Sequence, residues 1–274
     1  MQALGSFVHA PTGATFNICV LNSPEMKNRA FALLHRKYIE EAKVPWDFPK
    51  DNPSNIRVEK RVVNGVDNVP VLVDAFEHTA LICGIISVSD GELVGTSRVL
   101  RRSDMANRKL ELELYDAFPI DLCKKVDDEK IDIELNRMAI DGCLKGMSSI
   151  YLTYSVMLST FCNHKKVDNG KAIFTLNEGV LEKFKSISIG VGAEVQGSFK
   201  YSDNDPATVT CVFCSTFQAF LVSHVLALRS LTFPIPRVLV KVLAITRVLA
   251  KVARIVGRIY SATLKNPNFK PHHA

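Results

Sequence analysis

Alternation of apolar and polar residues is clearest in the stretch KIDIELNRMAID, residues 130–141. Isoleucine or leucine alternates there with aspartate, glutamate or asparagine, and a period of two predicts a β-strand with one face in a core. Glu134 and Arg137 stand three residues apart, on opposite faces of an ideal strand. The spacing alone favours an ion pair at a strand end, and a bulge would be needed to bring both side chains into one cleft.

Other patterns predict elements on both sides of this strand. Residues 24–43 carry apolar side chains at helical spacing, which predicts an amphipathic helix. Two β-rich runs, 69–88 and 92–100, flank Ser89-Asp90-Gly91, a strong hairpin signal. The charged, irregular residues 101–129 are expected to form a surface loop or short helix. Further elements are expected as a helix at 147–161, a strand at 171–176, a helix at 178–187, and strands at 192–201 and 207–217. Strands with intervening helices indicate an α/β protein with a mixed sheet.

The run from residue 206 to 228 is long enough to span a bilayer. Its first half is rich in Val, Thr, Cys and Phe and follows a turn, which favours a core strand. Gln218 and His224 would be costly in lipid. We therefore expect a core strand followed by a buried helix.

Charge is distributed unevenly along the chain. The whole sequence has 34 basic and 28 acidic residues, a net charge of +6. From residue 223 onward there are nine Lys and Arg and no acidic residue, so we expect two parts, one large domain at 1–222 and a basic helical tail at 223–274. Helical spacing of residues 237–260 gathers six basic side chains on one face opposite an aliphatic face. These six are Arg237, Lys241, Arg247, Lys251, Arg254 and Arg258.

This amphipathic pattern is typical of binding to an anionic membrane surface, without crossing it. A tail docked on its own domain is the first alternative. Nucleic acid is a weaker one, because the aliphatic face has no aromatic stacking residues. No nucleic-acid partner is therefore expected.

Seven scattered cysteines suit reduced packing residues in the cytoplasm. The amino terminus lacks the pattern of a signal peptide. Cys211-x-x-Cys214 is a lone pair inside an expected strand, so packing is favoured over a zinc site and no metal is expected. Phosphate-loop, dinucleotide, nucleophile-elbow and HExxH motifs are absent from the sequence, which counts against the corresponding enzyme classes.

The order of the remaining polar residues resembles that of acyl-homoserine lactone synthases and long-chain N-acyl amino acid synthases. The matching residues, over roughly residues 25–220, are Arg36, Trp46, Asp74-x-x-x-His78, Gly95-Thr96-x-Arg98 and Glu134-x-x-Arg137. The resemblance implies the fold of the GCN5-related N-acetyltransferases, a mixed sheet flanked by helices and splayed where an acyl thioester enters. It implies catalytic roles for Glu134, Arg137 and Arg98, and substrate binding by Arg36, Trp46, Asp74 and His78.

The implied reaction moves a long-chain acyl group from acyl carrier protein to the amine of an amino acid or similar acceptor, with no permanently bound cofactor. The family's aromatic residue after the helix arginine is Glu40 here, which counts against S-adenosylmethionine as acceptor. The sequence DGCLKGMSS lacks the loop that holds the coenzyme A pyrophosphate, whereas an acyl-phosphopantetheine arm would not need it.

The densest basic cluster outside the tail is expected to dock the acidic carrier. It consists of Arg101, Arg102, Arg108 and Lys109. Alternatives are a lactone synthase that uses S-adenosylmethionine and a non-catalytic, membrane-recruited lipid-binding adaptor on the same fold. The protein is expected to be cytoplasmic and peripherally bound to the inner face of the membrane.

Overall fold

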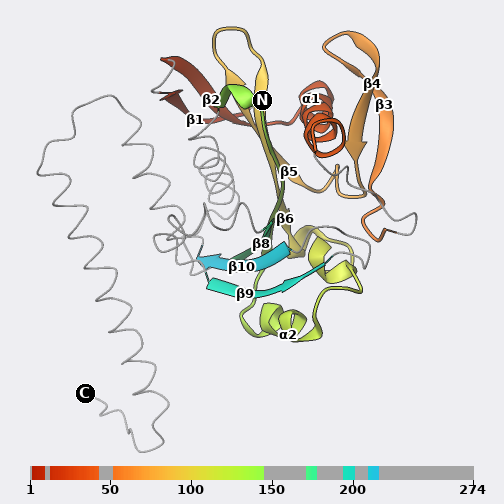
Figure 1. Cartoon of the computed structure of the whole chain (residues 1–274). Helices are drawn as coiled ribbons and strands as arrows, with labels where there is room; N and C mark the ends of the chain where they lie inside the picture. Colours follow the sequence, from red (N-terminus) through yellow and green to blue (C-terminus); the bar gives the residue numbers. More distant parts are fainter. Residues whose placement is uncertain are drawn as a thin grey trace, which may run out of the picture. The chain divides into compact units, whose positions relative to one another are not determined.

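A computed structural model describes residues 2–9, 13–42, 52–144, 171–177, 194–200 and 209–215 (Figure 1). The chain divides into two units, Met1–Leu231 and Thr232–Ala274, and the second lies outside the described residues. The strands are β1 Gln2–His9, β2 Ala14–Val20, β3 Arg57–Val63, β4 Val66–Val73, β5 Leu81–Ser87, β6 Leu93–Arg101, β7 Ile133–Ile140, β8 Lys171–Asn177, β9 Glu194–Phe199 and β10 Val209–Ser215. The helices are α1 Pro24–His35 and α2 Ile120–Asp128, with short helical turns η1 Arg36–Glu40, η2 Arg102–Asp104, η3 Glu111–Leu114 and η4 Gly142–Leu144.

In the described part of the chain, eight strands form one mixed sheet in the order β1-β2-β5-β6-β7-β8-β10-β9. Neighbours are antiparallel except β7 and β8, which are parallel. The predicted strand at 130–141 is β7, in the interior of this sheet. The predicted hairpin is confirmed as β5 and β6, and Gly91 in its turn has φ of 71°, a conformation that favours glycine.

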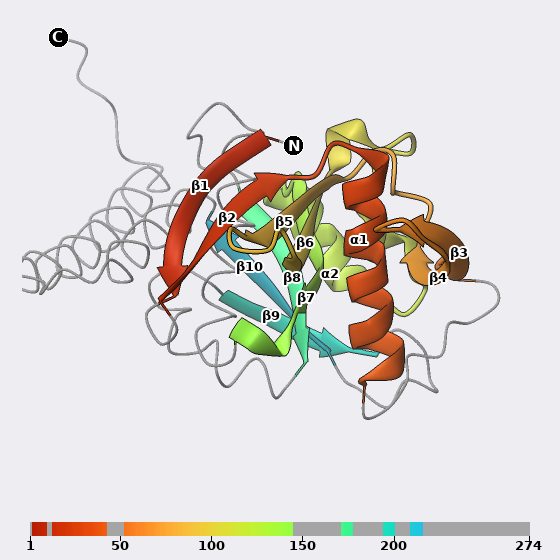
Figure 2. The same cartoon turned by 90° about the horizontal axis from the view of Figure 1, so that it is seen from above.

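Helix α1 begins at a local capping signal. The Ser23 side chain accepts a hydrogen bond from the backbone N–H of Met26 at 3.3 Å, and Pro24 occupies the first turn. Phe31 and Leu34 are among its buried residues. The helix lies between the large sheet and the separate β3–β4 hairpin, and contacts both (Figure 2).

The sheet has an apolar core on each face. One cluster joins α1 and β4 to the sheet through residues such as Phe31, Val71 and Leu100. A second includes Ile18 and Ile85. Two-sided burial explains why the central strands are apolar on both faces.

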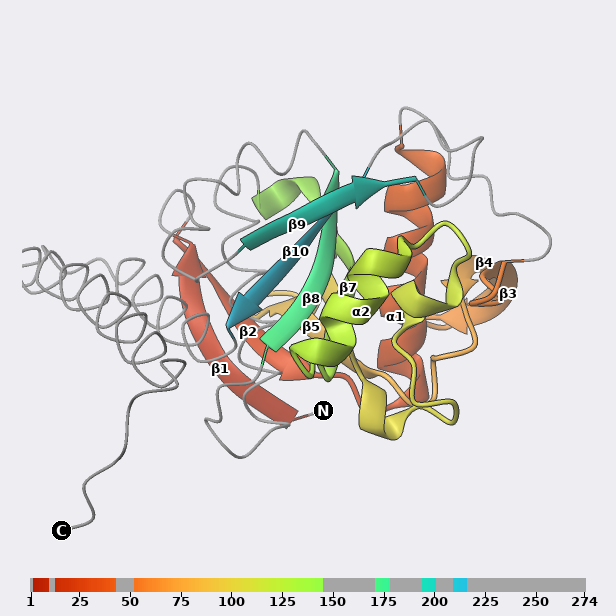
Figure 3. The same ribbon diagram turned by 90° about the horizontal axis from the view of Figure 1, so that it is seen from below.

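The parallel ladder between β7 and β8 is short. It joins Ile133–Leu135 to Ala172–Phe174, although each strand continues beyond it. Helix α2 lies beside this end of the sheet (Figure 3). Phe118, just before α2, contacts Phe199 of β9 edge to face at 5.3 Å.

The structure corrects several sequence-based boundaries. The apolar run at 69–88 is divided by a turn into β4 and β5. Strands β1, β2 and β3 were not predicted. In β3, charged residues stand between valines on a largely exposed hairpin, so its pattern shows no apolar face. Residues 101–129 are not only surface: Leu110, Leu112 and Val126 are buried there.

Strands β8, β9 and β10 confirm three of the later predictions, and β10 supplies the strand expected in the first half of the 206–228 run. The predicted helices at 147–161 and 178–187 and the tail at 223–274 lie outside the described residues. None of the helices that are described is long and apolar enough to cross a membrane.

Candidate active site

A β-bulge in β7 changes the direction in which the side chains of this strand point. The ladder with β6 shifts register between Thr96 and Arg98, where two residues of β7 lie opposite one. Arg137 sits in the bulge with φ of 52°, a left-handed conformation that costs a non-glycine residue about 1–3 kcal/mol. Glu134 and Arg137 are 1% and 9% exposed and lie within β7, and Arg137 forms ion pairs with Asp74 and Glu111.

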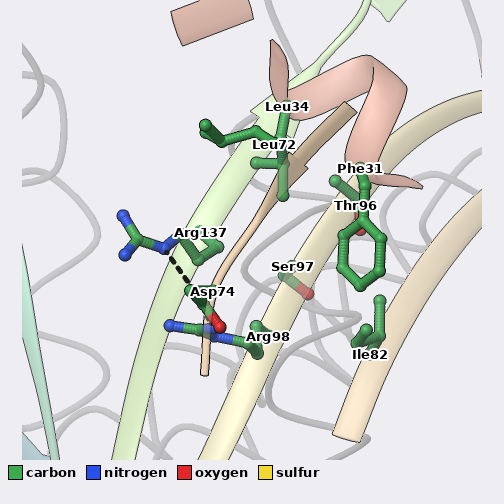
Figure 4. A pocket seen from close by; sticks show the side chains of 9 residues that line it. All are labelled: Phe31, Leu34, Leu72, Asp74, Ile82, Thr96, Ser97, Arg98 and Arg137. Carbon is green, nitrogen blue, oxygen red and sulfur yellow. Dashed lines mark hydrogen bonds and ion pairs between the residues drawn. The ribbon is translucent and has the colours of Figure 1, made fainter. Parts of the chain in front are cut away.

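Two buried arginines share two buried carboxylates. Arg98 donates one hydrogen bond to Asp74 and one to Glu111. Arg137 donates from Nη2 to Glu111 Oε1 at 2.7 Å. It also donates from Nε to Asp74 Oδ2 at 3.4 Å (Figure 4). The backbone N–H of Phe76 donates to the other oxygen of Asp74 at 2.9 Å. Two positive and two negative charges therefore compensate one another away from water.

Glu134 is bound by two uncharged donors. The backbone N–H of Leu112 donates to its Oε2 at 3.1 Å, and Asn136 Nδ2 donates to its Oε1 at 2.8 Å. Asn136 Nδ2 also donates to Glu111 Oε2 at 2.7 Å, and Asn136 Oδ1 accepts from Arg98 Nε at 2.7 Å. Glu134 thus adjoins the charge-compensated cluster as an additional carboxyl group.

These surroundings shift the pKa values of Glu134 and Asp74 in opposite directions. Burial, followed by the charge of Glu111, raises the pKa of Glu134 to about 8. Burial acts in the same direction on Asp74, but Arg98 and Arg137 outweigh it and hold the pKa of Asp74 below its ordinary value. Asp74 is therefore ionised at neutral pH, whereas Glu134 exchanges its proton near pH 8.

Two tyrosines border the cluster. The Tyr115 hydroxyl and Ser54 Oγ share a hydrogen bond at 3.0 Å, and the Tyr38 hydroxyl donates to the carbonyl of Met138 at 2.9 Å. Burial raises the pKa of both phenols. Both are accordingly neutral near pH 8 and can donate hydrogen bonds.

A small cavity lies between α1 and the two arginines (Figure 4). Its free volume of about 10 Å³ is close to that of a single water molecule, so it cannot hold an acceptor or an acyl chain. Ser97 Oγ is buried, and the described part of the chain provides no hydrogen-bond partner for it. The lining residues are Phe31, Leu34, Leu72, Asp74, Ile82, Thr96, Ser97, Arg98 and Arg137.

The structure divides the predicted substrate-binding residues. Asp74 belongs to the buried cluster, whereas the His78 side chain is 86% exposed beside Glu77. Arg36 pairs at 2.5 Å with Asp141, which follows the far end of β7. Trp46 lies outside the described residues.

The predicted carrier-docking residues differ in whether they form ion pairs. Arg101 pairs with Asp104, and Arg102 pairs with Glu113 and Asp127. Arg108 and Lys109 are exposed, and no ion pair is found for either in the described part of the chain. The six basic tail residues lie outside the described residues.

Two cluster members, Glu111 and Asn136, were missed by sequence reasoning. Asn136 stands between the two motif residues of β7, and its spacing of two from Glu134 places both on one strand face. Glu111 lies in a segment whose charge suggested a surface loop. The alternation of Leu110, Glu111 and Leu112 was the available signal for a partly buried segment.

No group of His, Cys, Asp or Glu among the described residues could hold a metal ion. Cys211 and Cys214 lie in β10, consistent with the predicted strand.

Comparison with known proteins finds no matching family model and no matching curated sequence. Solved structures do match. The structure of FeeM, an N-acyl amino acid synthase from uncultured soil microbes, is 14% identical, with a TM-score of 0.49 over 74% of this chain and 92% of that one. TofI, in a ternary complex with an inhibitor and MTA, is 13% identical, with a TM-score of 0.48 over 82% and 97% of the two chains.

The AHL synthase LasI is also 13% identical, with a TM-score of 0.44 over 74% of this chain and 91% of its own. The mixed sheet with flanking helices has the architecture that the motif order predicts, and the solved structures similar to it include members of the two synthase groups that those motifs resemble.

Proposed function

We propose that this protein is an N-acyltransferase that moves a long-chain acyl group from acyl carrier protein to the amine of an amino acid or a related small acceptor. The observation that carries the proposal is Glu134, a fully buried carboxyl group with a pKa of about 8, held by two neutral donors beside a charge-compensated cluster. The order of motifs around it supports the reaction class.

Glu134 acts as the general base in this proposal. An amine acceptor is largely protonated at neutral pH, and an ammonium group is not a nucleophile. A carboxylate with a pKa near 8 is closer in basicity to an amine than an ordinary glutamate is, so it accepts the proton more readily. Proton transfer occurs directly or through one water molecule.

The reaction then balances as follows. The ammonium group gives one proton to Glu134, and the neutral amine attacks the carbonyl carbon of the acyl thioester. A C–N bond forms, the C–S bond breaks, and the second amine proton goes to the departing thiolate. The products are an amide and a free thiol, with one proton left on Glu134 for release to solvent.

Arg98 and Arg137 support the base indirectly. The resemblance implies catalytic roles for both arginines, but both are engaged with Asp74 and Glu111. In this arrangement the guanidinium groups keep Asp74 ionised, and their hydrogen bonds to Asp74 and Glu111 hold the bulged strand in place. Buried compensating charges of this kind hold a site in one geometry when all of their hydrogen bonds are made.

The short β7–β8 ladder supports a binding place for the thioester. Past Leu135 and Phe174 the two strands no longer pair, as expected for the splayed sheet of the resembled families. Glu134 lies within the paired segment, one residue before its end. Arg108 and Lys109 are the predicted docking residues that remain available for an acidic carrier.

The acceptor side and the membrane role remain parts of the proposal. Arg36 and Trp46 are assigned to the acceptor by motif position, and His78 loses support because it is exposed. The basic tail is proposed to bind the cytoplasmic face of an anionic membrane, where an amphiphilic product can enter lipid.

The deciding assay is acceptor-dependent release of free thiol from an acyl thioester. Acyl carrier protein and coenzyme A thioesters are compared over a panel of amino acids and S-adenosylmethionine. We expect carrier thioesters to be preferred, and Glu134→Gln to lower turnover by about 10²–10⁴-fold. Glu92→Gln is the matched control, because Glu92 is exposed and pairs only with Arg29 among its described ion pairs.

The competing function is a non-catalytic lipid-binding adaptor, favoured only by the amphipathic tail. Both functions give liposome binding. An intact, folded protein that releases no thiol with any donor and acceptor pair would favour the adaptor. If the rate with acyl-coenzyme A were comparable to that with acyl carrier protein, the transferase function would stand, but the preference for a carrier protein would be rejected.

A further inference from the structure

Asn136 connects three charged side chains from three elements. Its Nδ2 donates to Glu134 Oε1 at 2.8 Å and to Glu111 Oε2 at 2.7 Å, while its Oδ1 accepts from Arg98 Nε at 2.7 Å. An arginine can only donate and an ionised carboxylate can only accept, so the chemistry of the partners fixes the orientation of this amide.

The amide separates two carboxyl groups that repel each other when both are ionised. Glu111 is bound by both arginines, whereas the partners of Glu134 are the Leu112 N–H and the Asn136 amide. The Nδ2 group thus places its two N–H donors between the carboxyls. It is a side-chain donor to Glu134 that a substitution can remove without altering the backbone.

We infer that Asn136 is a positioning residue that favours the ionised form of Glu134 and aims its carboxylate for proton abstraction from the acceptor amine. The inference rests on the proposed function, because it concerns the base of that reaction. Asn136 need not touch the substrate: it acts through the orientation and charge state of Glu134.

Other charged and titratable groups face Glu134 from the neighbouring elements. Glu111 on η3 disfavours its ionised form, Arg98 on β6 favours it, and Tyr115 lies close enough to respond to its charge. On the β8 side its register partner is Ile173, which is apolar. Only Asn136 both contacts Glu134 and holds Glu111 in place among these side chains.

The test is the pH dependence of kcat/KM for acyl transfer by the full-length protein, with one donor and one acceptor throughout. Loss of a hydrogen bond to a charged group should move the rising limb of the profile in Asn136→Ala by about one to two pH units toward alkaline pH. At the alkaline plateau the rate should return to within about tenfold of the original. Asn28→Ala is the matched control, because Asn28 bonds Arg61 and the Val62 carbonyl outside the cluster.

Two further variants keep the test decisive if Asn136→Ala does not fold. Asn136→Ser has one hydroxyl donor in place of two N–H donors, so its limb should lie between those of the original and the alanine variant. Asn136→Asp adds another carboxylate beside Glu134 and Glu111 and should shift the limb furthest. The inference would be overturned if the rising limb of the kcat/KM profile stayed at the same pH in the folded variants while kcat/KM fell equally at every pH.

Failure of the inference and failure of the proposed function give different results. If Glu134→Gln keeps the original rate and profile, Glu134 is not the base and the proposed function loses its main support. If Glu134→Gln is inactive while the Asn136 variants show no shift, only the positioning role is rejected.

Discussion

Replacing Glu134 with glutamine should change how the stability of the protein depends on pH. The side chain keeps nearly the same shape, but it can no longer ionise. In the folded protein the carboxyl pKa is about 8, compared with an ordinary value of 4.5. The folded state therefore binds the proton more tightly than the unfolded state between these two pH values. Stability conferred by this group is fully present below pH 4.5 and is lost as the pH rises to about 8.

The size of the effect follows from the pKa difference. A shift from 4.5 to about 8, at about 1.4 kcal/mol per pKa unit, amounts to about 5 kcal/mol. Glutamine introduces a cost of its own, because its amide nitrogen must face either the Leu112 N–H or the Asn136 amide, both of which donate. One clash between donors costs about 1–3 kcal/mol.

The variant should consequently be less stable than the original protein near pH 5, by up to about 2 kcal/mol, and more stable near pH 9, by about 2–4 kcal/mol. Urea unfolding of both full-length proteins from pH 5 to pH 9 measures the difference, and common contributions from the rest of the chain cancel. Glu92→Gln, at an exposed position, should show a difference that is small and nearly constant. A constant difference for Glu134→Gln as well would refute the reasoning, since it would mean that Glu134 titrates as an ordinary carboxyl.

Three other outcomes test the remaining structure. Asp74→Ala should destabilise the fold by about 3–5 kcal/mol, because it removes one carboxylate from two buried arginines; recovery of stability in Asp74→Asn to near the original value, measured by urea unfolding, would argue against charge compensation. Gly95→Ala should cost about 1–3 kcal/mol, because a Cβ there would lie 3.0 Å from Ile85 Cδ1, and an unchanged thermal midpoint would contradict this. Deleting residues 235–274 should abolish sedimentation with anionic liposomes and leave thiol release in solution; undiminished sedimentation would exclude the tail as the membrane anchor, whereas unfolding would favour a tail docked on its own domain.

The sequence was informative where one pattern determined one structure. Alternation at 130–141 identified β7, and the Asp-Gly step identified the β5–β6 turn. Motif order also identified Arg98, Asp74 and Glu134, which the fold brings together. These predictions succeed because local geometry and burial act in the same direction.

Sequence reasoning failed where the partner of a side chain lies far along the chain. Glu111 is separated from Arg137 by 26 positions, and nothing in its local pattern indicates that pairing. The bulge at Arg137 was recognised as a requirement for a shared cleft, yet spacing alone could not distinguish it from a regular strand. His78 matched its motif position but faces solvent, because a strand motif does not specify where the following turn directs a side chain.

The short ladder between β7 and β8 has a consequence for folding order. Strands β1, β2, β5, β6 and β7 follow one another in the sheet nearly as they do in sequence, so their contacts close comparatively short loops. Strands β8, β10 and β9 join that group in the described backbone only through the pairing of Ile133–Leu135 with Ala172–Phe174. The two groups of strands are thus suited to be separate cooperative units in hydrogen exchange. Since Glu134 lies on the boundary between them, local opening there would admit solvent to the base without unfolding the strands that carry its partners.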